Sequence, residues 1–295
     1  MGKLLITGAS GFIGRRFIEK YADSYDISTV SLREIAASDI NFYEVETVLH
    51  LSALVHQKKV LARDEYFKIN FDQTVALAKS AKSKGVRHFI FFSTVAVYGT
   101  NGYLDGEPEV LINEDSSCNP IEPYGESKRS AELELLKMED EGFMISIIRP
   151  PMVYGVGCPG NMANLMRMVR RAPILPFNYS DNRRSMVSVN NLIYFTNLII
   201  CNKVRGITIP QDAHTLSIRA IVESLAKGNN RRIFLFKFPG VIFSYLCSRR
   251  QRVMRSLYGS LVFDTRASNE RAGFVAPHSP EDELYLMSSA GNAQE

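Results

Sequence analysis

Residues 7–14 read Thr7-Gly8-Ala9-Ser10-Gly11-Phe12-Ile13-Gly14 and join a short apolar run to an amphipathic stretch. The run 3–7 predicts a strand, and the apolar spacing in 12–21 predicts a helix. Glycines at these spacings permit a tight turn and a close backbone approach to a pyrophosphate, which the N–H groups of the helix start would bind. Ordinary strand–helix turns also contain glycine, but the position at the first such junction favours a dinucleotide site.

The same alternation of strand and helix continues through the first half of the chain. We expect strands at 27–32, 47–51, 88–93 and 144–149, and helices at 64–84 and 124–141. The strands are continuous apolar runs, as is typical of a parallel sheet covered by helices on both faces. The pattern predicts an α/β fold with a Rossmann-type, doubly wound parallel sheet. We expect the helix 64–84 to carry the apolar residues Phe67, Phe71, Val75 and Ala78.

The pattern changes after residue 155, where a loop with glycine and proline precedes a short helix at 161–171 and a polar stretch at 172–184. One more helix of the first domain follows at 190–201, and the chain from 206 forms a smaller, basic region of mixed structure. We therefore expect a cofactor domain of residues 1–155 and 186–205, interwoven with a smaller α/β substrate domain of residues 156–185 and 206–287. Residues 288–295 are small and polar, and we expect them to be disordered.

The composition is that of a globular protein. The 295 residues suit one large domain or two closely joined ones, and 45% hydrophobic with 22% charged residues excludes disorder and coiled coil. No run reaches the ~18 uncharged apolar residues of a membrane span, and the start lacks the pattern of a signal peptide. Four widely spaced cysteines predict reduced thiols in the cytoplasm and no metal site.

A tyrosine and a lysine stand at the right spacing for acid–base chemistry. Tyr124 and Lys128 lie four residues apart and would share one face of the helix 124–141. The lysine ammonium would lower the tyrosine pKa from ~10, so that the phenol could exchange a proton as a hydride moves at an adjacent carbon. Such pairs also arise by chance at a helix start. Thr94 ends the strand 88–93, where its hydroxyl could bind the reacting oxygen.

The residue after the second strand bears on which dinucleotide is bound. An acidic residue at this place normally binds the ribose 2′-hydroxyl of NAD. This chain has Ser31-Leu32-Arg33 there, with no carboxylate before Glu34. An arginine suits a 2′-phosphate, so we favour NADP(H); NAD(H) is the alternative if Arg33 only stacks on the adenine.

Five motifs follow one another in a characteristic order: residues 7–14, His50-Leu51-Ser52-Ala53, the stretch 93–99, residues 124–128 and the stretch 149–155. In this order and spacing the chain resembles the extended short-chain dehydrogenases/reductases over about residues 1–285. More narrowly, it resembles the NAD-dependent epimerase/dehydratase family, whose members act on nucleotide sugars.

The resemblance implies roles for individual residues. Tyr124 would be the catalytic acid/base, Lys128 its electrostatic partner and a ribose ligand, and Thr94 the hydroxyl that orients the sugar oxygen. The cofactor-binding residues would be Gly8, Gly11, Phe12, Ile13, Gly14, Arg33, Leu51, Ser52, Ala53, Ser93, Lys128 and Pro150. The substrate-binding residues would be Thr94, Asn161, Phe177, Arg184 and Arg255. Asn161 and the two arginines would hold the diphosphate, and Phe177 would meet the uracil.

Departures from the family pattern narrow the expected reaction. Nucleotide-sugar 4,6-dehydratases have Asp-Glu directly after the catalytic threonine, whereas this chain has Val95 and Ala96, which cannot transfer protons. The stretch 33–47 is also too short for the usual helix and third strand. Both features resemble reductases of UDP-linked 4-keto-6-deoxy-hexosamines in surface polysaccharide synthesis. The alternatives are a UDP-hexose or UDP-HexNAc 4-epimerase and, in a different class, a non-catalytic NADP-sensing protein, which usually lacks the Tyr/Lys pair.

The net charge of +4 is too small to indicate nucleic-acid binding, and no such motif is present. Its distribution is uneven, because no acidic residue lies between Glu223 and Asp264. The basic residues of this stretch are Lys227, Arg231, Arg232, Lys237, Arg249, Arg250, Arg252 and Arg255. We favour a lid of the substrate domain, with peripheral contact to an anionic membrane as the alternative. The family resemblance also implies a homodimer through the helices 64–84 and 124–141.

Overall fold

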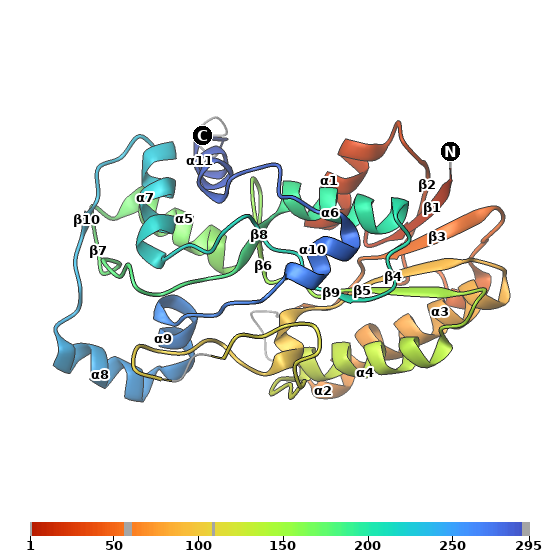
Figure 1. The fold of residues 1–295 in the computed structure, drawn as a ribbon, viewed down its shortest axis with the longest axis horizontal. Coiled ribbons are helices and arrows are strands. Elements are labelled where there is room, and N and C mark those ends of the chain that lie inside the picture. The colour runs from red at the N-terminus through yellow and green to blue at the C-terminus, as the bar shows by residue number, and fades with distance from the viewer. Residues whose placement is uncertain (1, 56–60, 108–109, 291–295) are drawn as a thin grey trace.

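A single parallel sheet organises the first region of the chain. The computed structural model describes residues 2–55, 61–107 and 110–290. Six parallel strands lie in the order β2-β1-β3-β4-β5-β9 (Figure 1). Their bounds are β1 (Lys3–Thr7), β2 (Asp26–Val30), β3 (Val45–His50), β4 (His88–Phe92), β5 (Met144–Ile148) and β9 (Gly206–Thr208). The predicted α/β, doubly wound class is confirmed.

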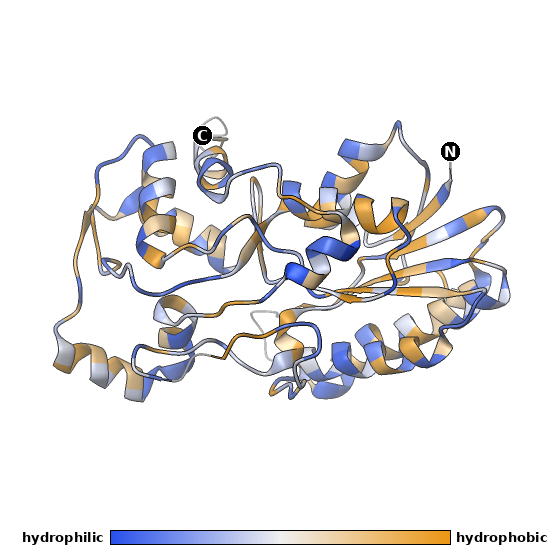
Figure 2. Cartoon of the chain, in the orientation of Figure 1, coloured by the Kyte–Doolittle hydropathy of each residue, from blue (hydrophilic) through white to orange (hydrophobic). Residues whose placement is uncertain are grey.

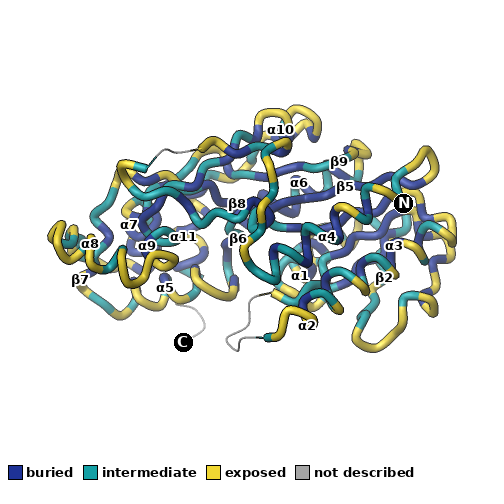
Figure 3. The backbone as a smooth tube through the Cα atoms, turned by 90° about the horizontal axis from the view of Figure 1, so that it is seen from below, coloured by how far each residue is buried: buried dark blue, intermediate teal, exposed yellow. Residues whose placement is uncertain are grey.

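Successive side chains of the strands point to opposite faces of the sheet, and both faces are buried. Ile6 and Ile90 face α1 (Phe12–Tyr21) and α6 (Val189–Cys201), whereas their neighbours Leu5 and Phe89 face the opposite layer. The opposite layer consists of α3 (Gln73–Ser83) and α4 (Pro123–Met138). Figure 3 shows that the sheet forms a buried layer between exposed helix surfaces. Helices on both faces explain why the strands are apolar throughout.

The stretch 64–84 is not one regular helix. It consists of α2 (Arg63–Phe67), a π-helical turn (Lys68–Asp72) and α3. The wider turn changes which residues face inward, and the buried ones are Tyr66, Asn70, Thr74, Leu77, Ala78 and Ala81. Of the apolar residues expected along this helix, Ala78 is fully buried and Phe71 packs against the core, whereas Phe67 and Val75 are only partly buried.

The connection between β2 and β3 is short, as expected from the sequence. It contains one 3₁₀ turn (Ala37–Asp39), and β3 pairs directly with β1. The usual third strand beyond β2 has no counterpart among the described residues, so β2 forms the edge of the sheet. Arg33, three residues after β2, is exposed.

A second region packs beside the carboxyl end of the sheet (Figure 1). Its buried apolar core joins helices and short strands that are far apart in sequence. The elements are β6 (Met152–Tyr154), α5 (Asn161–Arg171), β7 (Ile174–Leu175), β8 (Met186–Ser188), α7 (Ile218–Gly228), β10 (Phe234–Leu235), α8 (Gly240–Arg249), α9 (Gln251–Tyr258) and α11 (Pro280–Ala290). β6 pairs with β8, and β7 with β10, both in parallel.

The structure changes two boundaries that we expected. β9 pairs with β5 and belongs to the sheet, and Ala272 at the end of α10 (Arg266–Ala272) joins the core beside α6. The chain from 206 thus contributes to both regions. The expected disorder is wrong for 288–290, because α11 continues to Ala290 and Ser288 is buried against Gly228. Residues 291–295 lie outside the described residues.

Within the described part of the chain, none of the helices combines the length and apolar character needed to cross a membrane.

Two histidines are buried in the sheet. His50 lies between Thr7 Oγ1, 2.6 Å from Nδ1, and Thr74 Oγ1, 2.8 Å from Nε2. His88 Nε2 lies 2.7 Å from Ser146 Oγ. Burial lowers the pKa of His50 to about 3 and that of His88 to about 4.

These shifts predict a loss of stability in mild acid. Below a pH of ~6.5 the unfolded chain binds protons that the folded chain cannot, so the free energy of unfolding should fall by about 1.4 kcal/mol per pH unit for each histidine. Urea denaturation between pH 7.5 and 5 measures the slope. His88→Asn should reduce it, whereas Lys20→Asn, at an exposed site, should not. Equal slopes in both variants would contradict the prediction.

Candidate active site

The glycine turn after β1 is closely packed. Gly8 has φ of 72°, and a Cβ there would lie 2.7 Å from the backbone nitrogen of Ser52. A Cβ at Gly14 would lie 2.5 Å from the carbonyl oxygen of Gly8. The turn thus needs glycine in order to contact the loop after β3, and it leads directly into α1, whose first turn has no acidic residue. Such a helix start favours an anion.

A chain of buried hydrogen bonds leads from this turn across the sheet. The Thr74 hydroxyl donates to the carbonyl of Asn70 over 2.9 Å, so it accepts from His50 Nε2. His50 Nδ1 then accepts from the Thr7 hydroxyl, which itself accepts from the backbone nitrogen of Ser52. This order fixes both the tautomer of His50 and the position of the loop after β3.

Asn70 extends this chain to α4. Its Oδ1 accepts a hydrogen bond from the backbone nitrogen of Leu54 over 2.7 Å. Its Nδ2 donates to the carbonyl of Leu54 over 2.9 Å and to Ser127 Oγ over 3.2 Å. Ser127 Oγ in turn donates to the carbonyl of Tyr124 over 2.9 Å. Sequence reasoning missed Asn70, because it was expected within a regular helix. The signal was a pair of polar residues, Asn70 and Thr74, at i and i+4 among apolar neighbours.

Thr94 and Tyr124 come together at the carboxyl end of β4. Thr94 begins the 3₁₀ turn Val95–Tyr98, its hydroxyl accepts from the backbone nitrogen of Ala96 over 3.2 Å, and it is hydrogen-bonded to the Tyr124 hydroxyl. Gly125 permits this approach, since a Cβ there would lie 2.8 Å from the carbonyl oxygen of Ala96. The structure thus pairs the two hydroxyls that the sequence proposed for the reacting oxygen.

Lys128 is buried one turn further along α4. Its Nζ donates to the carbonyl of Phe92 over 2.7 Å and lies 4.4 Å from the ring centroid of Phe91. Burial lowers the pKa of Lys128 to about 7. Burial also raises the pKa of Tyr124 to about 12, opposed only in part by the Thr94 hydrogen bond. Burial therefore dominates the pKa of Tyr124, in the direction opposite to the lowering that we expected from Lys128.

A fully buried ion pair holds α4 against the sheet. Arg149 binds Glu132 with two hydrogen bonds, of 2.9 Å from Nε and 2.7 Å from Nη2. Its remaining nitrogen donates to the Tyr98 hydroxyl over 2.7 Å. Glu132 lies one turn beyond Lys128, so this pair fixes the helix that presents both proposed catalytic side chains. The resemblance covered the stretch that contains Arg149 but assigned the residue no role.

The residues at this edge fit a dinucleotide. The Ser93 hydroxyl is buried and, among the described residues, has no hydrogen-bond partner. The glycine turn leaves no room for side chains, and Pro150 follows β5 on the same edge. Arg33 lies exposed after β2. The remaining predicted cofactor residues also lie along this edge: Gly11, Phe12, Ile13, Leu51, Ser52 and Ala53.

A cavity of about 300 Å³ lies in the second region. It brings together three of the predicted substrate residues, Asn161, Phe177 and Arg184. Its other lining residues are mostly apolar: Met152, Met162, Asn164, Leu165, Met168, Ile218, Ile221, Arg252, Val253, Ser256 and Leu257. Burial lowers the pKa of Arg184 to about 10, and its Nη1 donates to three backbone carbonyls.

Arg255 is not at this cavity, contrary to our expectation. Its guanidinium binds Glu107 with two hydrogen bonds of 2.7 and 2.6 Å and also donates to the carbonyl of Gly102. Arg252, one turn earlier on α9, lines the cavity instead and pairs with Glu122. The sequence could not distinguish the two arginines, because they lie on one short helix and their acidic partners are more than a hundred residues away.

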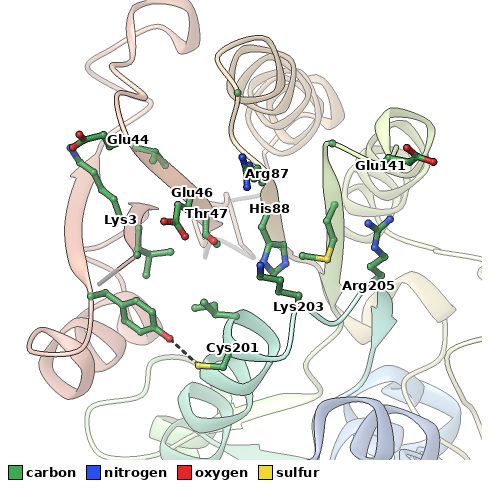
Figure 4. Close-up of a pocket in the computed structure, with 18 residues that line it drawn as sticks. Lys3, Glu44, Glu46, Thr47, Arg87, His88, Glu141, Cys201, Lys203 and Arg205 are labelled. Carbon is green, nitrogen blue, oxygen red and sulfur yellow. Dashed lines mark hydrogen bonds between the residues drawn. The ribbon is translucent and has the colours of Figure 1, made fainter.

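A larger cavity, of about 1090 Å³, lies at the opposite, amino edge of the sheet (Figure 4). Lys3, Thr47 and His88 line it near the starts of their strands. Its charged side chains are of both signs, as Arg87 and Glu141 illustrate. Ligands of doubly wound sheets bind at the carboxyl edge, where the glycine turn and the hydroxyl pair lie, so this cavity is not the candidate site.

Comparison with known proteins agrees with this geometry. The model of the NAD dependent epimerase/dehydratase family matches residues 4–208. The chain belongs to this family. The match confirms the predicted membership in the epimerase/dehydratase family and, with it, an enzyme of the nucleotide-sugar epimerase or reductase type.

The chain is similar in sequence to two 4-epimerases and in fold to a solved structure. A UDP-glucose 4-epimerase of Vibrio cholerae is 28% identical over 95% of this chain and 92% of its own length. An N-acetyl-alpha-D-glucosaminyl-diphospho-ditrans,octacis-undecaprenol 4-epimerase of Escherichia coli O157:H7 is 25% identical over 93% and 91%. The structure of RMD from Pseudomonas aeruginosa with NADPH has a TM-score of 0.80 at 18% identity and covers all of both chains.

The buried ion pair gives a direct test of the fold around the site. Arg149→Met should lower the free energy of unfolding by about 2–4 kcal/mol, because the buried Glu132 carboxylate loses both hydrogen bonds from Arg149 and keeps only the one from Arg129. Arg266→Met is a matched control that breaks an exposed pair with Asp264 and should cost at most about 1 kcal/mol. Urea denaturation measures both. A loss in Arg149→Met as small as in the control would show that the pair does not hold α4.

Proposed function

We propose that this enzyme transfers a hydride from NADPH to C4 of a UDP-linked 4-keto-6-deoxy-hexosamine. The observation that supports the proposal most is the hydrogen-bonded pair of Thr94 and Tyr124 at the carboxyl end of β4. Two hydroxyls so placed can bind one carbonyl oxygen. We further propose that the chain divides into a cofactor region and an interwoven substrate region, with the reacting carbon between them.

The pKa values of the site favour reduction. NADPH, when bound, supplies the hydride. Tyr124 has a pKa raised to about 12 by burial, so its phenol is protonated at neutral pH and can donate to the C4 oxygen as negative charge develops there. Lys128, with a pKa lowered to about 7, can hold or release a proton next to the tyrosine. An oxidation would instead need the tyrosinate as a base at the start.

The residues after Thr94 argue against a dehydratase. Val95 and Ala96 occupy the positions of the acid–base pair in 4,6-dehydratases and carry no titratable group. Proton transfer at C5 and C6 of the sugar would need such groups. A reaction confined to C4 requires only one acid and a hydroxyl to orient the oxygen, and this site has both.

The cavity of the second region suits a sugar carried on a diphosphate. Arg184 and Arg252 can offer guanidinium donors to phosphate oxygens, with Asn161 at the start of α5 beside them. Phe177 is buried in the wall, and its ring lies 5.9 Å from that of Tyr258. Phe177 can therefore offer an apolar surface to the carrier. UDP is the carrier named for the Vibrio cholerae relative.

A 4-epimerase is the second candidate, favoured by the names of both relatives. An epimerase removes the C4 hydride and returns it to the other face, using the same tyrosine and threonine. The Escherichia coli relative acts on a sugar whose diphosphate is joined to a polyprenol. The mostly apolar cavity wall is compatible with such a carrier as well as with a nucleoside.

The reaction and its acid are tested together by Tyr124→Phe. With a UDP-4-keto-6-deoxy-HexNAc as substrate, the natural chain should oxidise NADPH, seen as a fall in the nicotinamide absorbance. The kcat of the variant should be about 10²–10⁴-fold lower. Tyr66→Phe is the control, since it also removes one tyrosine hydroxyl, from a ring that lies 6.5 Å from that of Tyr124. Full turnover by Tyr124→Phe would refute the assignment. Interconversion of UDP-GlcNAc and UDP-GalNAc without net oxidation would instead identify an epimerase.

The cofactor preference is tested at Arg33. Arg33→Ala should lower kcat/KM for NADPH by about 10–100-fold, through loss of a charge-assisted bond to the 2′-phosphate, and should leave the value for NADH nearly unchanged. Lys20→Ala, at the far end of α1, should change neither. If Arg33→Ala affects NADPH and NADH equally, the residue does not select the cofactor.

A further inference from the structure

α8 is an unusual helix for a globular protein, since none of its 10 residues is buried. Phe243 and Leu246 pack partly against the core of the second region. The outward side carries Val241, Ile242 and Tyr245, which are 85%, 48% and 60% exposed. Figures 1 and 3 place α8 at the end of the molecule farthest from the sheet, and Figure 2 shows apolar residues along it. Exposed apolar residues grouped in this way mark an interaction surface.

Basic side chains border this apolar surface. The sequence has no acidic residue between Glu223 and Asp264. Arg249 and Arg250 are exposed at the end of α8, and the Arg249 guanidinium lies 5.9 Å from the ring centroid of Tyr245. In the part of the chain that the structure describes, neither arginine has an acidic side chain within ion-pair distance. A partner that fits is therefore both apolar and negatively charged.

We propose that α8 and its flanking arginines dock on the surface of an anionic lipid bilayer. Val241, Ile242 and Tyr245 enter the headgroup region, where apolar side chains and the amphipathic tyrosine ring are stabilised. Arg249 and Arg250 bind lipid phosphates. The proposal rests on this surface alone and does not depend on the proposed reaction.

Charge complementarity selects a bilayer over a second copy of this chain. In a two-fold symmetric dimer the same patch of both copies would meet, so two patches of the same positive net charge would come together. Such like charges repel when they are brought together out of water. An anionic lipid surface offers the opposite charge over the whole patch.

The position of the cavity makes this docking relevant to the substrate. α9 follows α8 directly, and its residues Arg252, Val253 and Leu257 line the cavity of the second region. An enzyme docked through α8 therefore has this cavity close to the lipid surface. The cavity could then bind a sugar that is joined through a diphosphate to a membrane lipid.

Vesicle binding of the full chain tests the proposal. The protein should sediment with vesicles of phosphatidylglycerol and phosphatidylcholine, less so at high salt, and not with phosphatidylcholine alone. The double variants Val241→Glu/Tyr245→Glu and Arg249→Glu/Arg250→Glu should each lower the partition coefficient about tenfold or more. Val275→Glu, at a residue that is 82% exposed elsewhere, and Lys20→Glu/Lys84→Glu are the matched controls and should bind as the natural chain does.

Several results would overturn the proposal. They are no binding of the natural chain to anionic vesicles, undiminished binding by both α8 variants, or an equal loss in the controls. Self-association in sedimentation velocity that Val241→Glu/Tyr245→Glu abolishes, without vesicle binding, would assign the surface to a second copy. The measurement needs no turnover, so a failure of the proposed reaction and a failure of the docking are separate results. Circular dichroism establishes that each variant is folded.

Discussion

The buried ion pair between Arg149 and Glu132 constrains the rest of the site. One guanidinium at the end of β5 binds the carboxylate of α4 and the hydroxyl of Tyr98, at the end of the turn that begins with Thr94. Because Arg149 is fully buried, any other position of α4 would leave a charge without a partner in the core. The helix that carries Tyr124 and Lys128 is thus fixed against the strand that ends beside Thr94.

A second buried polar chain restrains the same helix from the other side. Asn70 joins the loop after β3 to Ser127 of α4, and His50 and Thr7 continue the chain to the glycine turn. Each donor and acceptor in this chain has a defined partner, so small shifts of one element would leave buried groups unpaired. The π-helical turn at Lys68–Asp72 is the backbone conformation in which Asn70 faces inward. The proposed cofactor turn and the proposed catalytic helix are therefore positioned together.

Burial gives this site an electrostatic character opposite to that of an isolated tyrosine–lysine pair. The pKa of the phenol is raised and that of the ammonium is lowered, so at neutral pH the tyrosine is protonated and the lysine is close to its midpoint. The second region differs, since its arginines lie at an apolar cavity and along an exposed apolar helix. We therefore propose proton transfer at the sheet edge and recognition of a charged, partly apolar carrier in the second region.

The local sequence determined the glycine turn, the order of strands and helices, and the family, because these depend on short-range spacing and turn chemistry. It also placed Thr94 at the carboxyl edge of the sheet, since parallel strands end together, and Tyr124 and Lys128 on one face of a helix. Tertiary structure alone decided the rest. Arg255 pairs with Glu107 and not with the cavity, β9 joins the sheet, and Asn70 turns inward through a π-helical turn. Each of these features depends on partners that are distant in sequence. The pKa values of Tyr124 and Lys128 depend on desolvation in the folded core, which local spacing does not reveal either.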